Sequence, residues 1–404
     1  MRTIVKGTSP NEDKIITIFA FQGNETVKCY NIKQKYFEIT IEQMGQYRKQ
    51  PRSSPYMLIK SSDRGDLKHL SIRKQCKQIN KEANKLKILT DGKINLYRTG
   101  NSPKTALLLF YDLCSPPIPD KIESYEVDIF ESCRGPIIWA EPYEGIGYKY
   151  DICSEYPSLM SSSQHKYPIG KGELKKFTNE EFEQLKFFSF GIYHVKVTVK
   201  NKKVFKVNNK NWYTHTDLNY AKTKLKLEIK LIEDDEPNVL LYDNTKLITG
   251  KKLFGPFIDY LFNFKKAGHR EVKQILNALW GALSQTNVLT INTDKIRAGK
   301  EILTITPSDN GTLTFETVIK EKFYESDFAR IKPFMMSYGR LKISNIILTN
   351  LDKVVRVHTD GLICTSEITN IKLGNDLGNL TYEGKGNCKI FNCNKYTWKE
   401  IKEI

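Results

Sequence analysis

The first residue that could do chemistry is Asp151. Residues 146–152 alternate between apolar and other side chains, which predicts a strand with Tyr150 on one face and Asp151 on the other. Pro157 ends the strand pattern, and the turn before it would leave the backbone amides of residues 154–156 open. A carboxylate beside such a turn can hold a hard cation and the phosphates bound to it. A simple cap for the turn is an equally weighted alternative.

Asp360 is the second candidate. It precedes Gly361 between two β-branched runs, and Asp-Gly is one of the strongest short signals for a hairpin turn. Val355 and Val357 would share one face of the first strand, so that His358 and Asp360 share the other. The hairpin would thus carry a carboxylate to its tip. Asp-Gly also occurs in many turns that have no chemistry, and that alternative stays open.

Between these two carboxylates in the sequence, the segment 271–285 is predicted to form an amphipathic helix. Its apolar stripe consists of Val272, Ile275, Leu276, Leu279 and Leu283. The opposite face offers a cation, an amide, an aromatic ring and bare backbone: Lys273, Asn277, Trp280, Gly281 and Ser284. Such a face can hold a phosphate, stack a base and admit a second backbone. A solvated face without a ligand is the alternative.

The overall charge agrees with a polyanionic partner. The 404 residues include 63 Lys and Arg against 46 Asp and Glu, a formal net charge of +17. A Lys-rich composition can equally reflect AT-rich coding, so charge alone does not decide. No apolar run approaches the roughly 18 residues of a membrane span, no secretory start is seen, and the eight cysteines form no Cys-x-x-Cys pair. We expect reduced thiols, no membrane partner and an intracellular protein whose compartment is undetermined.

Two basic stretches could carry that charge to a partner. Residues 60–98 have a local charge of +7, and the apolar residues of 72–86 recur at helical spacing. A DNA-facing helix and a solvated basic face have equal weight there. Residues 200–230 are predicted to form a basic inserted module with strands and a turn at 208–211. A Pro-rich link at 115–119 precedes the part of the chain in which the motifs lie.

Together and in this order, the three pieces resemble the polymerase motifs of family B DNA polymerases, most closely the protein-primed branch of viruses, phages and linear plasmids. The first motif, Asp-x-x-Ser-x-Tyr-Pro-Ser, is matched by Asp151, Ser154, Tyr156, Pro157 and Ser158. The second, Lys-x-x-x-Asn-x-x-Tyr-Gly, is matched by Lys273, Asn277 and Gly281, with Trp280 in place of Tyr. The third, Asp-Thr-Asp-Ser, keeps Thr359 and Asp360 and has His358 and Gly361 at its other positions. The resemblance covers about residues 132–396.

Weaker matches extend the resemblance. Arg340 ends a segment similar to the family's Thr-x-x-Gly-Arg motif, which contacts the template. Lys395 and Tyr396 are similar to the Lys-x-Tyr motif that supports the primer terminus. Residues 133–136 lie where the family has Tyr-x-Gly-Gly. The intervals between the main motifs leave room for insertions like those that contact a priming protein and encircle DNA, and the module at 200–230 falls in the first interval.

The resemblance implies an α+β right-hand architecture with an antiparallel-sheet palm, helical fingers and a short thumb. The implied parts are an amino-terminal region (1–130), a first palm part with the basic module (131–245), fingers (246–290), a second palm part (291–370) and the thumb (371–404). No Asp before Asp151 is followed by Glu two places on. We therefore expect residues 1–130 to be a remnant or replacement of the family's exonuclease domain, without its metal site.

The implied activity is template-directed DNA synthesis, in which deoxynucleotides are added to a 3′-hydroxyl by two-metal catalysis. Asp151 and Asp360 would bind two Mg²⁺ ions, with Mn²⁺ as an alternative, and Lys273 would neutralise phosphate charge during catalysis. The residues implied to hold the nucleotide are Ser154, Glu155, Tyr156, Lys273, Asn277 and Trp280. Tyr156 would lie under the sugar and exclude a 2′-hydroxyl. The residues implied to contact DNA are Gly281, Arg340, Lys395 and Tyr396.

The implied partners are a primed DNA template, deoxynucleoside triphosphates and, in the protein-primed branch, a terminal priming protein. Two other functions stay open. A decayed mobile-element polymerase would bind nucleic acid without catalysis, which the missing exonuclease site and His358 favour. A palm enzyme that makes RNA is a more distant alternative. Primer extension by the purified protein with Mg²⁺ separates the first two, and a comparison of ribonucleotides with deoxynucleotides tests the third.

Overall fold

The computed structural model describes residues 17–21, 26–31, 35–40, 56–58, 67, 69–99, 101–133, 135–292, 300–307, 313–319 and 322–401. The chain divides into two compact units. Unit 1 comprises Met1–Ser115 and Asp259–Ala282, and unit 2 comprises Pro116–Ile258 and Leu283–Ile404. Both units contain helices and sheets, and the predicted α+β class is confirmed. The five-part division by residue ranges stays a prediction.

Unit 1 combines a small sheet with helices. Its sheet has the order β3-β2-β1-β4, in which β1 and β4 are parallel and the other pairs antiparallel. The strands are β1 (Thr17–Phe21), β2 (Thr26–Asn31), β3 (Lys35–Thr40) and β4 (Tyr56–Leu58). The helices are α2 (Ile72–Leu89), α3 (Leu96–Thr99), α4 (Ser102–Cys114), the 3-10 helix η3 (Arg270–Val272) and α10 (Lys273–Leu283). Helix α9 (Gly250–Lys266) begins in unit 2 and ends in unit 1.

The helix predicted in the basic stretch of residues 60–98 is present as α2. Ile79, Ala83 and Leu86 are buried, as the apolar spacing predicts. The helix ends before Thr90, because Asp91 (φ +48°) and Gly92 (φ +75°) have left-handed backbones that cannot continue it. The Thr90 hydroxyl donates to the Leu86 carbonyl. The apolar stripe faces the small sheet, since α2 contacts β1 and β2.

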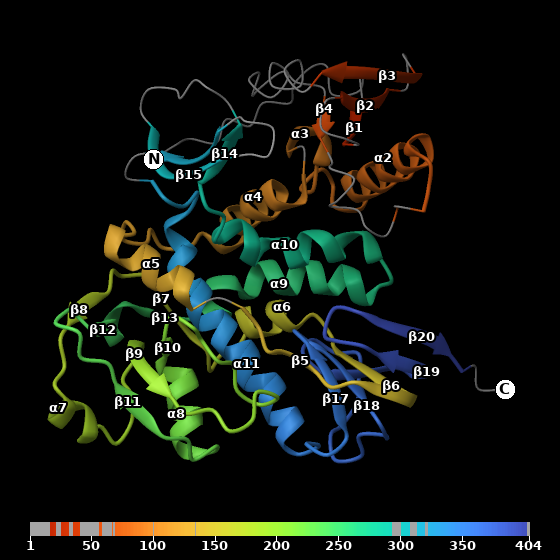
Figure 1. Cartoon of the computed structure of the whole chain (residues 1–404). Helices are drawn as coiled ribbons and strands as arrows, with labels where there is room; N and C mark the ends of the chain where they lie inside the picture. The colour runs from red at the N-terminus through yellow and green to blue at the C-terminus, as the bar shows by residue number, and fades with distance from the viewer. Residues whose placement is uncertain are drawn as a thin grey trace. The chain divides into compact units, whose positions relative to one another are not determined.

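A six-stranded antiparallel sheet carries the core of unit 2 (Figure 1). Its order is β20-β19-β6-β18-β17-β5. The strands are β5 (Ile138–Ala140), β6 (Tyr143–Ile152), β17 (Val354–His358), β18 (Gly361–Cys364), β19 (Leu380–Ile390) and β20 (Tyr396–Glu400). Tyr150, Ile152 and Leu362 are buried on one face of this sheet. The strand predicted over 146–152 is therefore confirmed, with Tyr150 and Ile152 in the core, whereas Ile146 at its other end is 43% exposed.

Helix α11 (Lys332–Leu348) is buried along most of its length because it has neighbours on two sides. Ile343 and Ile347 belong to the same hydrophobic cluster as Tyr150 of the six-stranded sheet. On its other side α11 contacts α8 (His215–Thr223), which borders a second sheet. Helix α11 thus passes between the two sheets of unit 2 (Figure 1).

The second sheet has the order β10-β9-β12-β8, with β11 paired to β9. Its strands are β8 (Glu173–Lys175), β9 (Gly191–Val197), β10 (Trp212–Thr214), β11 (Ile229–Leu231) and β12 (Val239–Leu241). The other described strands of unit 2 are β7 (Lys166–Pro168), β13 (Leu247–Thr249), β14 (Leu289–Asn292), β15 (Lys300–Pro307) and β16 (Leu313–Ile319). The remaining helical segments are α5 (Ser124–Ser132), α6 (Glu155–Met160), α7 (Asn179–Glu183), η2 (Asn244–Lys246) and η4 (Asp327–Ile331). None of the described helices combines the length and apolar character of a membrane span.

The basic module at 200–230 differs in part from the prediction. The predicted turn at 208–211 is present, with the Asn211 N–H donating to the Asn208 carbonyl at 3.0 Å. The middle of the module is the helix α8 rather than a strand. The side chain of Thr214 accepts from the Asp217 N–H, and a capping residue followed by an acidic residue in the first turn favours the start of a helix.

The residues predicted as a thumb include two strands of the six-stranded sheet. Within 371–404, β19 pairs with β6 along most of its length, and β20 pairs with β19. In the described part of the chain these residues therefore extend the six-stranded sheet. The pairing joins segments far apart in the sequence, so no local pattern could reveal it.

Candidate active site

The pairing of β6 with β18 brings Asp151 and Asp360 together. Asp151 lies opposite Gly361, the first residue of β18. The Ile152 N–H donates to the Asp360 carbonyl at 3.1 Å. Gly361 places no side chain against the Asp151 carboxylate, whose Oδ1 would lie 3.6 Å from a Cβ at that position. Two aspartates from distant parts of the chain thus meet at one end of this strand pair.

The backbone beside both aspartates is strained. Ser154, with φ +49°, and Thr359, with φ +63°, are in the left-handed region, which is unfavourable for residues other than glycine and most of all for a β-branched residue. Thr359 is held there by its N–H, which donates to the Ile137 carbonyl at 3.2 Å. Such residues cost about 1–3 kcal/mol each and persist only where the surrounding structure imposes them. Tertiary contacts therefore define both turns.

The hairpin predicted around Asp360 is present, with its turn one residue earlier than Asp-Gly suggests. His358 pairs with Gly361, so the two turn residues are Thr359 and Asp360. Gly361 pairs with both His358 and Asp151. Directly paired residues share a face of the sheet. His358 therefore lies on the same face as Asp151, separated from it by a glycine.

A third carboxylate, that of Glu155, is buried in the same region. Glu155 is 2% exposed, and its Oε1 has no hydrogen-bond partner among the described residues. Burial raises the pKa of Glu155 to about 8, the charge on Asp360 adds to the shift, and Lys342 opposes it. Asp151 adds a smaller effect in the same direction as Asp360. The family resemblance implies nucleotide binding for Glu155, and no pattern in the sequence indicates its burial beside the two aspartates.

Lys342 is a neighbour of this region that none of the sequence motifs includes. Its Nζ donates to the Ser158 hydroxyl at 3.1 Å. Burial lowers the pKa of Lys342, and the charge on Glu155 opposes that shift. The sequence holds one indication of this role. Lys342 lies in the largely apolar helix α11, and a lysine in such a helix is expected to have a polar partner inside the protein.

Tyr156 is half-buried next to Glu155. Burial raises the pKa of Tyr156 above its usual range, and the negative charges of Glu155 and Asp360 act in the same direction. The phenol therefore stays neutral at physiological pH. Its predicted contact with the nucleotide sugar stays a prediction.

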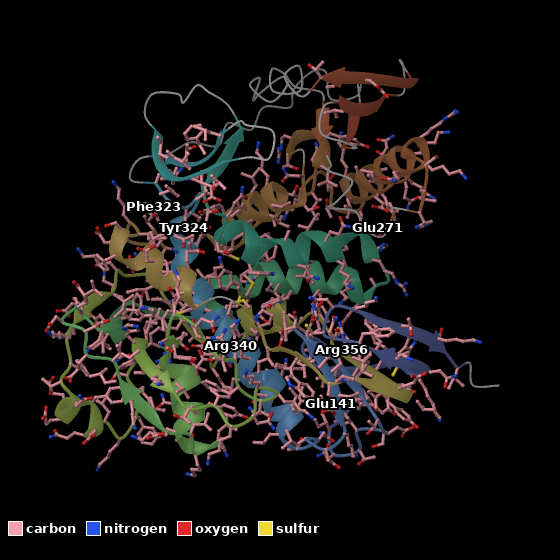
Figure 2. The ribbon with its side chains drawn as sticks, in the orientation of Figure 1. Glu141, Glu271, Phe323, Tyr324, Arg340 and Arg356 are labelled. Atoms are coloured by element: carbon pink, nitrogen blue, oxygen red, sulfur yellow. The ribbon has the colours of Figure 1, made fainter. Side chains whose placement is uncertain are left out.

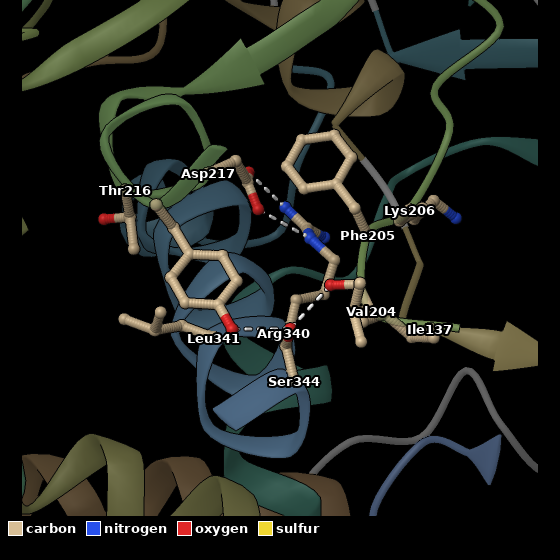
Figure 3. A pocket seen from close by; sticks show the side chains of 10 residues that line it. Ile137, Val204, Phe205, Lys206, Thr216, Asp217, Arg340, Leu341 and Ser344 are labelled. Atoms are coloured by element: carbon tan, nitrogen blue, oxygen red, sulfur yellow. Dashed lines mark hydrogen bonds and ion pairs between the residues drawn. The ribbon is translucent and has the colours of Figure 1, made fainter. Parts of the chain in front are cut away.

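Arg340 lies inside unit 2, in a setting different from the one predicted (Figure 2). Its guanidinium donates to both carboxylate oxygens of Asp217, at 2.9 and 2.7 Å, and to the Gly135 carbonyl at 2.8 Å (Figure 3). Both side chains of the ion pair are less than 10% exposed, and Lys206 and Tyr220 line a small cavity beside them. Arg340 is not placed as an open DNA contact requires. Because Asp217 lies 123 residues earlier, the sequence alone could not show this pair.

Tyr396 is the first residue of β20 in the six-stranded sheet, and Lys395 directly precedes that strand. The Arg356 guanidinium lies over the Tyr396 ring, 4.5 Å from its centroid. Arg356 also donates to the Cys393 carbonyl from Nε at 3.0 Å and from Nη2 at 2.8 Å. Lys395 is exposed, with Nζ 5.3 Å from the centroid of the Phe391 ring. Arg356 thus holds Tyr396 in place while the Lys395 ammonium faces solvent.

The helix predicted over 271–285 is present as η3 followed by α10, which belong to unit 1 as far as Ala282. The predicted apolar stripe is buried: Val272, Ile275, Leu276, Leu279 and Leu283. On the other face Lys273 and Gly281 are exposed, and Asn277 and Trp280 are half-buried. The Asn277 Oδ1 is buried and has no hydrogen-bond partner among the described residues. Ser284, predicted on the polar face, is buried.

One family model and several solved structures are similar to this chain. The family model for DNA polymerase type B, organellar and viral, matches residues 72–368. No curated protein matches the sequence. A structure of phi29 DNA polymerase complexed with single-stranded DNA has 19% identity and a TM-score of 0.57, covering 76% of this chain and 58% of that chain.

Two further phi29 polymerase structures are similar. The post-translocation complex with primer-template DNA has 19% identity and a TM-score of 0.59, covering 81% of this chain and 59% of that chain. The ternary complex with primer-template DNA and incoming nucleotide substrates has 14% identity and a TM-score of 0.59, covering 96% of this chain and 87% of that chain. In the first two comparisons this chain spans less than two thirds of the phi29 polymerase. At these identities the likeness establishes the fold.

The Arg340–Asp217 pair predicts a large effect on stability. Arg340→Ala leaves the Asp217 carboxylate buried and unpaired, so the free energy of unfolding should fall by about 3–5 kcal/mol. Urea unfolding measures the change. Asn345→Ala, at an exposed position of the same helix, is the control and should shift stability by less than about 0.5 kcal/mol. Equal stability of the two variants would contradict a structural role for the pair.

Glu155 predicts a pH dependence of stability. The folded protein keeps Glu155 protonated up to about pH 8, whereas the unfolded chain loses this proton near pH 4.5. The unfolded state therefore gains stability as pH rises through that window. Wild-type protein should lose stability relative to Glu155→Gln between pH 5 and 8, by up to about 1.4 kcal/mol per unit. Unfolding of both proteins with a chelator present measures this, and parallel pH profiles would refute it.

Proposed function

The chain belongs to the organellar and viral type B DNA polymerases, and we propose that it extends a DNA primer on a template by adding deoxynucleotides to the 3′-hydroxyl. The observation that carries the proposal is the pairing of β6 with β18, which sets Asp151 opposite Gly361 and next to the backbone of Asp360. One carboxylate near the end of β6 and one in the turn before β18 are the donor pair that two-metal phosphoryl transfer needs.

The donor set fits Mg²⁺, with Mn²⁺ as a substitute. Among the described residues, no three His, Cys, Asp or Glu side chains are grouped closely enough to form a metal cage. Mg²⁺ is usually held by one or two carboxylates together with substrate phosphates, and Asp151 and Asp360 match that pattern. His358 offers no anionic oxygen. Bound there, the two ions would activate the primer hydroxyl and stabilise the leaving pyrophosphate.

Residues of α10 are proposed to hold the incoming nucleotide. The exposed ammonium of Lys273 would neutralise charge on the triphosphate. The buried, unpaired Oδ1 of Asn277 is an acceptor whose desolvation is compensated once a donor reaches it. The half-buried Trp280 would pack near the nascent base pair, and the exposed Gly281 would let the DNA backbone approach.

In unit 2, the turn after Asp151 is proposed to contact the nucleotide. The backbone of residues 154–156 would bind its phosphates. The neutral phenol of Tyr156 would lie beneath the sugar and exclude a 2′-hydroxyl. Lys395 and Tyr396 are proposed to contact the primer strand, because Tyr396 begins β20 of the six-stranded sheet that carries Asp151 and Lys395 directly precedes it. The place of Arg340 in a buried pair supports a positioning role for it instead of a template contact.

A finer part of the proposal concerns priming. The motif spacing resembles the protein-primed branch, in which the first nucleotide is joined to a hydroxyl of a terminal protein. The basic module at 200–230 is the proposed contact for that protein. The primer-extension reaction below does not depend on this part, since it supplies a ready 3′-hydroxyl.

The two aspartates are tested by primer extension. Asp151→Asn and Asp360→Asn should each lower the extension rate on the order of 10³-fold, equivalent to about 4 kcal/mol of transition-state stabilisation. DNA affinity should stay within a few-fold of wild type. Glu144→Gln, at an exposed carboxylate of the same strand β6, is the matched control and should extend normally. Near-normal extension by either Asn variant would rule out the two-metal assignment.

Sugar selection is tested at Tyr156. Tyr156→Ala should raise ribonucleotide incorporation relative to deoxynucleotide by about tenfold or more, because the ring that obstructs the 2′-hydroxyl is gone; tenfold corresponds to about 1.4 kcal/mol. Tyr156→Phe keeps the ring and should behave like wild type. The measurement is the ratio of kcat/KM for the two nucleotide classes. An unchanged ratio in Tyr156→Ala would assign the ring to packing.

A further inference from the structure

Helix α2 carries a straight stripe of lysines on its solvent side. Its 18 residues include six basic side chains and one acidic one. Lys74, Lys77, Lys81 and Lys85 follow one another at spacings of three, four and four, so they share one face of the helix. All four are exposed. The stripe runs for about 16 Å, at 1.5 Å per residue, on the side opposite to the buried Ile79, Ala83 and Leu86.

This arrangement opposes helix stability. The first turn of α2 contains no acidic residue, although the positive end of the helix dipole favours anions there and disfavours cations such as Arg73 and Lys74. Like charges three and four residues apart repel each other as well. Within the described part of the chain, Lys74, Lys77 and Lys81 have no ion-pair partner. A solvated face commonly mixes both signs, whereas this face is arranged to meet a polyanion.

The far end of the stripe joins the helix that the proposed function uses. Lys85 Nζ lies 2.6 Å from Glu271 Oε1, and both residues belong to unit 1 (Figure 2 labels Glu271). Glu271 is two residues before Lys273, the first residue of α10. The ion pair thus fixes the end of the lysine stripe beside the start of α10.

We propose that Lys74, Lys77 and Lys81 bind the phosphates of the single-stranded DNA template ahead of the nascent base pair. This inference rests on the proposed function, in which α10 packs against that base pair. The template strand beyond the nascent base pair is unpaired. The lysine stripe of α2, which the Lys85–Glu271 ion pair joins to the start of α10, would therefore meet a single strand. Ile88, 73% exposed and three residues after Lys85 in line with the stripe, adds an apolar contact that an unstacked base can use and a paired base cannot.

The test compares two DNA hairpins that share one duplex. One is blunt, and the other has a single-stranded 5′ template extension of about ten nucleotides, longer than a stripe of three lysines needs. The variant is the triple Lys74→Ala, Lys77→Ala, Lys81→Ala, because alanine is the best helix former and keeps α2 intact. Fluorescence anisotropy measures DNA affinity across a range of NaCl concentrations, and circular dichroism checks the fold.

For the extended hairpin, the slope of log affinity against log salt should become shallower by about 2 units, since each neutralised single-strand phosphate contributes about 0.7. For the blunt hairpin the slope should not change. A matched triple in unit 2, Lys186→Ala, Lys196→Ala, Lys246→Ala, removes three exposed lysines and should leave both slopes unchanged. If the alanine triple is not helical, the corresponding Lys→Gln triple replaces it.

Three results would overturn the proposal: an unchanged slope on the extended hairpin, an equal loss on both hairpins, or a raised KM for deoxynucleotide with both slopes intact. An equal loss on both hairpins would mean that the stripe binds duplex DNA. A raised KM with unchanged slopes would mean that it binds the nucleotide. The binding measurement needs no nucleotide addition. Failure of wild-type protein to extend a primer would therefore count against the proposed function. The salt dependence of DNA binding by the α2 variant could still be interpreted.

Discussion

The candidate site depends on the register between β6 and β18. Because side chains alternate along a strand, a slip of one residue would turn Asp151 into the core and expose Tyr150. Burial of Tyr150 and Ile152 with Leu362 on one face of the sheet holds that register. The hydrophobic face therefore determines where the charged face lies.

The same region concentrates costs that the rest of unit 2 must offset. Ser154 and Thr359 have left-handed backbones, and Glu155 is a buried acid with one unpaired oxygen. None of these would persist in an isolated hairpin. Tertiary contacts surround them: the Thr359 N–H donates to the Ile137 carbonyl, and α6, which follows Ser154, packs against α11. The packing of unit 2 therefore supports turns beside Asp151 and Asp360 that the local sequence disfavours.

Short-range patterns predicted much of this fold. The alternation in 146–152 identified β6 and the face of Asp151, and the helical spacing in α2 and α10 identified their buried stripes, because such periodicities follow directly from backbone geometry. Contacts between residues far apart in the sequence could not be predicted. Asp217 and Arg340 are 123 residues apart, and the sequence of β19 has no pattern that indicates its pairing with β6. The turn at Thr359 was misjudged by one residue, since the cross-strand pairing of Gly361 outweighs its preference for a turn.

The small number of carboxylates has a consequence for how metals and nucleotide would bind. Asp151 and Asp360 supply two negative charges, against four positive charges on two Mg²⁺ ions, and His358 adds none. Glu155 does not make up the difference, because burial keeps its pKa at about 8. The remaining charge must come from the triphosphate, which Mg²⁺ sites commonly use as a ligand. Metal and nucleotide would then stabilise each other in the site, so that neither binds tightly alone. Under the proposed function, Lys273 would then contribute by retaining the nucleotide, and the metals would bind with it.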